Sequence, residues 1–225
     1  RVSITAYDGV NDDTVFNSNT PSTGPLLRDS TGWYHIVVAV DTAQGTAANR
    51  IRFYVNNQEV SITVTTAVGQ NEDLFNASGS SFYIAKNFAG TYGDGYLADF
   101  YYSDGYQYTP SDFGETNDHG IWVPKKSSIS YGTNGFKLEF QQTGTSADAS
   151  GKGADTSGNG NHAGTGGLAA INITTDTPTN NFATLNSIAD ISRDVTFTEG
   201  NTRASIGNGS TNRAHATMGF TSGKW

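Results

Sequence analysis

Alternation of apolar and polar positions is clearest between residues 28 and 108. Residues 33–41 (WYHIVVAVD) are rich in β-branched and aromatic types, and apolar side chains occupy both alternating faces. This pattern predicts a central strand. Residues 50–55 (RIRFYV) alternate cleanly, which predicts a strand with one core-facing side. Asn56 and Asn57 follow; both tolerate positive φ, so they predict a tight hairpin turn into a strand over residues 59–65.

Two later runs, 82–85 and 96–102, combine aromatic and aliphatic residues and are bounded by Gly, Asn or Asp. Each therefore predicts a further strand. A single helical turn is expected at 109–113, because Thr109 suits the cap and Pro110 suits the first helical position. No segment shows a helical period, so the chain is predicted to be all-β and antiparallel.

The character of the chain changes after residue 114. Short apolar pieces at 121–123 and 136–140 stand between long Gly, Ser, Thr and Asn stretches, and residues 141–167 offer almost no apolar side chains. Such a segment cannot build a core of its own, so we expect an extension that wraps the domain or a neighbouring subunit. The predicted domains are 1–120, a jelly roll; 121–167, an extended polar arm with short strands; and 168–225, a linker and the start of a second β domain.

Composition narrows the function. The chain has 225 residues, a formal net charge of −8 and no cysteine. An acidic surface repels phosphate, so no nucleic-acid partner is expected. No apolar run approaches the length of a membrane span, so no membrane insertion is expected. The lack of cysteine favours assembly in a reducing cytosol.

Three separated motifs carry a family resemblance: WYHIVVAVD at 33–41, IRFYVN at 51–56 and GYLADFY at 95–101. In this order they resemble the second half of a laminin G-like module, which implies an antiparallel β-sandwich of the concanavalin A-like jelly-roll type. The long Gly/Ser/Asn-rich region would then be an irregular extension of this sandwich. The resemblance also implies that the first half of such a domain precedes Arg1, or that residues after 120 complete the domain.

The downstream segments are similar to a group of predicted bacteriophage structural proteins. They are DFGE at 112–115, WVPKK at 122–126, YGTNGF at 131–136, DTSGNGN at 155–161, DTPTNN at 176–181 and SGKW at 222–225. The last of these resembles the opening of a SPRY-like domain. The resemblance implies a non-enzymatic virion protein of a tail fibre, appendage or capsid decoration, assembled in the host cytoplasm and carried on the particle surface. The alternative is an adhesion module that binds glycans of the host cell.

Catalytic constellations are not evident in the sequence. A glycosidase needs two carboxylates around one sugar bond, but Asp99 and Asp104 have odd spacing, which places them on opposite strand faces. Glu139 is alone in its apolar segment. His35 lies inside a predicted strand, which indicates a packing role. We therefore expect no enzymatic activity.

The sharpest metal candidate is Asp155, Ser157 and Asn159, whose oxygens alternate as in the first half of a calcium loop with Gly160 at the sixth position. The acidic ligand required at the twelfth position is missing, because Gly166 stands there. A polar turn is the favoured reading of this motif, and any Ca²⁺ site would be weak. No other cofactor is expected.

Exposed aromatic residues give two further expectations. Four tyrosines are candidates for stacking on a host glycan: Tyr92, Tyr96, Tyr102 and Tyr106. Packing against the core or another subunit is the alternative for these rings. Three large apolar residues in the polar region are candidate contacts with copies of the chain or other virion proteins: Trp122, Phe136 and Phe140.

Overall fold

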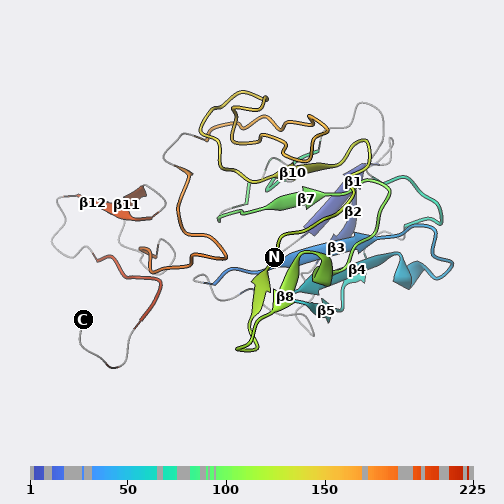
Figure 1. Cartoon of the computed structure of the whole chain (residues 1–225), viewed down its shortest axis with the longest axis horizontal. Coiled ribbons are helices and arrows are strands. Elements are labelled where there is room, and N and C mark those ends of the chain that lie inside the picture. Colours follow the sequence, from blue (N-terminus) through green and yellow to red (C-terminus); the bar gives the residue numbers. More distant parts are fainter. Residues whose placement is uncertain are drawn as a thin grey trace. The chain divides into compact units, whose positions relative to one another are not determined.

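The computed structural model describes residues 3–7, 12–17, 27, 32–64, 68–74, 82–86, 90, 92–93, 95–168, 172–186, 195–198, 201–207, 213–219 and 222 (Figure 1). Over these residues the regular structure consists of β-strands and two single turns of 3₁₀ helix. The all-β prediction is confirmed. No described helix is long and apolar enough to cross a membrane.

The strands are short. Their bounds are β1 Ser3–Tyr7, β2 Asp12–Asn17, β3 Ile36–Val40, β4 Ile51–Val55, β5 Gln58–Val60, β6 Thr63–Val64, β7 Phe100–Tyr102, β8 Gly114–Thr116, β9 Trp122–Pro124, β10 Phe136–Leu138, β11 Val195–Thr198 and β12 Arg203–Ile206. The 3₁₀ turns are η1 (Ala47–Asn49) and η2 (Pro110–Asp112). Every strand pair is antiparallel.

The described strands form small sheets, with orders β1-β2-β6, β3-β4-β5, β10-β7, β8-β9 and β11-β12. They divide between two compact units. Unit 1 comprises Arg1–Leu27, Tyr34–Leu97 and Gly105–Ser130, and unit 2 comprises Arg28–Trp33, Ala98–Asp104 and Tyr131–Trp225. The boundaries predicted at residues 120 and 167 follow composition instead and stay a prediction.

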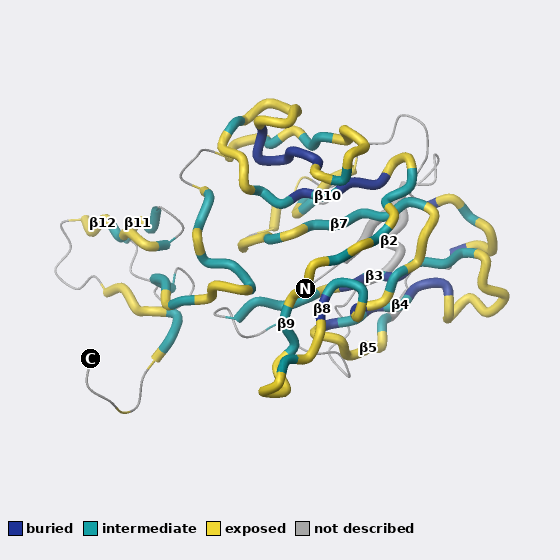
Figure 2. The backbone as a smooth tube through the Cα atoms, in the orientation of Figure 1, coloured by how far each residue is buried: buried dark blue, intermediate teal, exposed yellow. Residues whose placement is uncertain are grey.

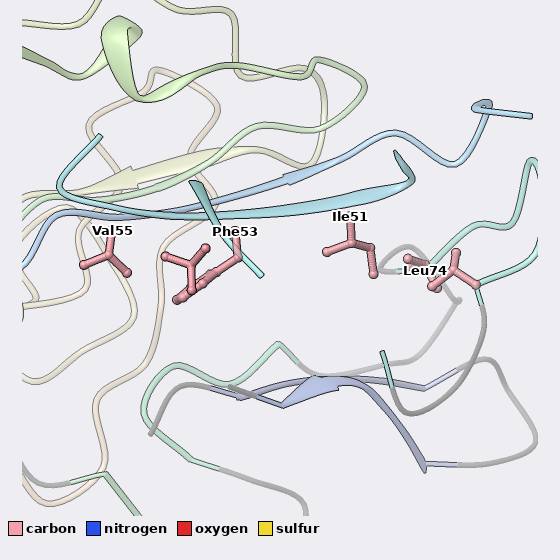
Figure 3. Close-up of a cluster of buried hydrophobic side chains, with 6 residues drawn as sticks. Ile51, Phe53, Val55 and Leu74 are labelled. Carbon is pink, nitrogen blue, oxygen red and sulfur yellow. The ribbon is translucent and has the colours of Figure 1, made fainter. Parts of the chain in front are cut away.

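The core of unit 1 lies on one face of strand β4. Ile51, Phe53 and Val55 are buried and alternate with partly exposed neighbours, as the sequence pattern predicts. Figure 3 shows these side chains projecting to one side of the sheet, where Leu74 also lies. Burying side chains of this size contributes about 1.5–3 kcal/mol each, so this cluster is the main apolar anchor of the unit.

The hairpin between β4 and β5 forms as predicted. Asn56 and Asn57 both have positive φ, 46° and 67°, and Val55 pairs directly with Gln58 across the turn. Two successive positive φ values match the twist of the flanking strands, which is why asparagine suits both positions. The Asn56 side chain also accepts a hydrogen bond from the His35 N–H at 2.8 Å, which ties the turn to the start of β3.

Three strand predictions are wrong in part. Residues 82–85 form no strand, and the run at 96–102 is extended only from Phe100. Ala85 and Asp99 have positive φ, 57° and 49°, which interrupts extended backbone beside each segment. Strand β3 pairs with β4 alone in the described sheet, so β4 holds the central place expected for residues 33–41.

The turn at 109–113 is confirmed as η2. The Thr109 N–H donates to the Asp112 carboxylate at 2.7 Å, and the Asp112 N–H donates to the Thr109 carbonyl at 3.0 Å. Pro110 occupies the first position, where no backbone donor is needed.

In unit 2 the ladder of β7 and β10 supports a small aromatic core. Phe136 packs against Phe100 and Tyr102, with ring centroids 5.9 and 5.4 Å apart. Leu138 is fully buried. The buried positions continue into residues 151–155, as the dark segment beside β10 in Figure 2 shows.

Residues 141–167 fold back on unit 2 instead of extending away from it. Isolated bridges join Leu138 to Asp155 and Gly153 to Ala163. Lys152 is buried, and its ammonium donates to the Thr143 and Gly144 carbonyls at 2.8 and 3.3 Å. The arm therefore folds onto β10 and onto itself, whereas wrapping of the predicted domain at 1–120 or of a neighbouring subunit stays a prediction.

Candidate functional site

The Asp155 carboxylate accepts hydrogen bonds from two separate segments of unit 2. Its Oδ1 accepts hydrogen bonds from the N–H groups of Lys137 at 2.9 Å and Ser157 at 2.8 Å. Its Oδ2 accepts the N–H of Asn161 at 2.9 Å. The Asp155 N–H donates in turn to His162 Nδ1 at 2.9 Å. One carboxylate therefore joins strand β10 to both ends of the 155–161 loop.

These hydrogen bonds set the charge state of Asp155. Burial acts to raise the pKa of the carboxyl, but the N–H donors and the Ser157 hydroxyl stabilise the anion more, and the pKa lies below its ordinary value. A carboxylate that receives several backbone donors is stabilised in its charged form because such bonds are stronger than neutral ones.

The side-chain amides of Asn159 and Asn161 donate hydrogen bonds, whereas the Asp155 carboxylate accepts them. Asn159 Nδ2 donates to the Gly132 and Gly135 carbonyls at 2.7 and 2.9 Å. Asn161 Nδ2 donates to the Thr133 and Gly135 carbonyls at 3.1 and 3.0 Å. The loop thus accepts a hydrogen bond from β10 through Asp155 and donates hydrogen bonds to the turn at 131–135 through Asn159 and Asn161. It therefore links β10 to that turn.

This geometry bears on the predicted calcium loop. Oδ1 of Asp155 already accepts two donors, which fill its lone pairs, and Ser157 Oγ accepts the Asn159 N–H at 3.2 Å. Calcium requires six to eight oxygen ligands, and within the described residues no group of three or more His, Cys, Asp or Glu side chains is placed to hold a metal. The residues therefore fit the polar turn that the sequence favours, and a weak calcium site stays the untested alternative.

A second cluster joins β3 to the β8–β9 hairpin within unit 1. Trp122 Nε1 donates to His35 Nδ1 at 3.0 Å, and the two rings are stacked with centroids 5.9 Å apart. The Phe113 ring also packs against His35, with the two ring centroids 6.2 Å apart. Because Nδ1 is the acceptor, His35 is neutral with its proton on Nε2. Burial lowers the pKa of His35 below its ordinary value.

The candidate subunit contacts are placed differently from one another. Phe136 is buried inside unit 2, so its ring is not available for the predicted contact with another chain. Trp122 is half-buried and engaged with His35, and Phe140 is half-buried at a backbone φ of 54°. Only Trp122 and Phe140 keep exposed surface for the predicted contact.

The four candidate glycan tyrosines do not form one group. Tyr102 is partly buried against Phe136 in unit 2. In unit 1, Tyr92 is 74% exposed, Tyr96 is exposed, and Tyr106 stacks on Tyr108 at 6.3 Å. Sequence reasoning missed that Lys86 lies beside Tyr92, because a lone lysine in a polar loop gives no signal of its own.

The pairing of β7 with β10 also brings carboxylates together that no single strand reveals. Lys137 forms an ion pair with Glu139, and its ammonium lies 5.4 Å from the Tyr101 ring centroid. Asp99 interacts with both charges; burial raises the pKa of Asp99, Lys137 acts to lower it and Glu139 to raise it. Asp99 and Glu139 therefore interact although they belong to distant segments of the sequence. Asp99, Lys137 and Glu139 thus form a small network of charged groups, with Lys137 paired to Glu139.

Comparisons of the chain with protein-family models, with curated proteins and with solved structures find no match.

Replacement of Asp155 by Asn tests the carboxylate. Asn keeps one acceptor but turns an amide N–H₂ toward Asn161 or Ser157, so we expect a loss of about 1–3 kcal/mol in the free energy of unfolding. The folded-state pKa is lowered, so the stabilisation is present above about pH 4 and is lost as pH falls through the folded value. Urea unfolding at several pH values measures both effects.

Asp148→Asn is the matched control, because Asp148 is exposed and bonds only within its own turn. We expect it to change stability less than Asp155→Asn at pH 7. Equal losses from the two variants contradict a central role for Asp155.

The His35–Trp122 contact predicts a second pH dependence. Because the folded-state pKa of His35 is lowered, the unfolded chain binds the proton first as pH falls below about 6.5, and stability decreases there. His35→Gln should remove that part of the pH dependence of the melting temperature, whereas His119→Gln, an exposed histidine of the β8–β9 turn, should leave it. A wild-type profile that His35→Gln does not alter rules the coupling out.

Proposed function

We propose that this chain is a non-enzymatic structural subunit of a bacteriophage particle, in a tail fibre, appendage or capsid decoration. It is carried on the particle surface and contacts copies of itself and other virion proteins. The motifs at 33–41, 51–56 and 95–101 support the proposal through their resemblance to laminin G-like modules. The downstream segments support it through their similarity to phage structural proteins.

A concanavalin A-like sandwich is part of the same proposal. The strands are antiparallel, and the β4 side chains Ile51, Phe53 and Val55 project to the side on which the β1–β2 hairpin is drawn in Figure 3. Side chains held between two sheet layers are the feature that such a sandwich requires. The described strands are short, and short strands are common at the edges of sheets in such a sandwich.

The observation that carries the proposal is the balance of apolar side chains. In the described residues eleven apolar side chains are buried, whereas ten large ones are exposed. The exposed ones are Ile36, Phe82, Tyr83, Tyr92, Tyr96, Leu97, Tyr106, Ile121, Leu168 and Ile206. Covering these side chains by another chain would gain about 25 cal/mol per Å² of apolar surface, which supports the proposed contacts.

The polar groups support a structural role as well. Asp155, Asn159 and Lys152 bind backbone groups of the chain itself. Glu139 is held by Lys137, and His35 by Trp122. Side chains committed in this way fix loops and are not left free to transfer protons to a substrate.

The test is the mass of the full chain in solution over about 1–100 μM, a range typical of specific association. Sedimentation velocity should show a defined oligomer. Ile121→Asp should weaken it by about tenfold or more in dissociation constant, because a charge replaces a side chain that is 58% exposed in the single chain.

Thr46→Asp is the matched control, since Thr46 is an exposed polar residue of unit 1 outside the β8–β9 hairpin; it should leave the oligomer intact. A monomer at every concentration, or equal effects of the two variants, contradicts the proposal.

A further inference from the structure

Lys86 lies beside two exposed tyrosine rings of unit 1. Its ammonium lies 4.4 Å from the Tyr83 ring centroid and 5.8 Å from that of Tyr92. The backbone fixes this arrangement, because Lys86 and Tyr92 form an antiparallel bridge and the Gly93 N–H donates to the Ala85 carbonyl at 2.7 Å. We call Tyr83, Lys86 and Tyr92 the Lys86 cluster.

The rings of this cluster leave much of their surface open. Tyr92 is 74% exposed and Tyr83 is 48% exposed. A ring that packs into a core buries most of its area, so the exposure of Tyr92 costs hydrophobic stabilisation that the fold does not recover by itself. Tyrosine rings at a surface offer an apolar face with a polar edge, which is the surface on which sugar rings stack.

The charge around the cluster narrows the ligand. Lys86 is the only Lys or Arg in the sequence between Arg52 and Lys125, and the whole chain carries a formal net charge of −8. A polyanion with closely spaced phosphates is repelled by such a chain. A single ammonium beside an open ring fits a ligand that carries one negative charge on each apolar ring.

We propose that the Lys86 cluster binds an acidic sugar residue of a polysaccharide. The C–H face of the pyranose stacks on Tyr92, and the carboxylate of the sugar pairs with the Lys86 ammonium. Tyr83 positions that ammonium through its ring face. This assignment adds a ligand to the structural role and does not depend on it, since every residue of the cluster belongs to one chain.

Calorimetric titration of the full chain with oligogalacturonate tests the proposal, with a neutral dextran oligosaccharide of similar length as the comparison. Wild-type protein should bind the uronate and bind dextran at least about tenfold more weakly, the factor that one charge-assisted contact gives. Lys86→Gln should remove the preference, and Lys86→Arg should retain it. Tyr92→Ala should weaken binding of both sugars.

Lys126→Gln is the matched control, because Lys126 is an exposed lysine of unit 1 for which the described residues show no cation–π contact. It should bind like wild type, and all variants should keep the wild-type melting temperature. Absence of uronate binding, equal affinity for dextran, or binding that survives both Lys86→Gln and Tyr92→Ala overturns the assignment.

Discussion

The polar segments between residues 131 and 161 of unit 2 depend on the Asp155 carboxylate. Three N–H groups converge on it, one from strand β10 and two from the 155–161 loop. A buried carboxylate without partners destabilises a fold by several kcal/mol, whereas one that accepts several backbone donors holds its charge and orders the donors. Asn159 and Asn161 then fasten the same loop to the carbonyls of the 131–135 turn. The 155–161 loop therefore links strand β10 to the turn at 131–135.

The two units meet the entropy cost of folding by different means. Unit 1 buries the alternating face of β4, with Phe53 only 3% exposed. Unit 2 buries Phe136 and Leu138 on a short ladder. Beyond them, hydrogen bonds accepted by the Asp155 carboxylate and donated by Lys152 order a segment with few apolar side chains. This answers from within the chain why residues 141–167 are ordered. A neighbouring subunit is not needed for that purpose, and the case for assembly rests on the exposed apolar side chains alone.

Sequence patterns predicted the features that depend on neighbouring residues. The period of two gave the buried face of β4, and the residue types gave the turns at Asn56–Asn57 and Thr109–Pro110. Prediction failed where a single backbone angle decides, as at Asp99, because no pattern signals a positive φ at that residue. It also failed for contacts between distant segments. The approach of Asp99 to Glu139 follows only from the register of β7 with β10, and the donors to Asp155 come from up to 18 residues away.

Amide hydrogen exchange measured by NMR tests the central claim most directly. If the Asp155 carboxylate orders residues 131–161, the amides of Lys137, Ser157 and Asn161 exchange together. They also exchange more slowly than the amides of the exposed residues Thr145 and Ala147. In Asp155→Ala, which removes both carboxylate oxygens, all three should lose protection, whereas the amide of Phe53 in unit 1 should keep its own. Exchange of the three amides at the rate of the exposed pair in the wild-type protein contradicts the account.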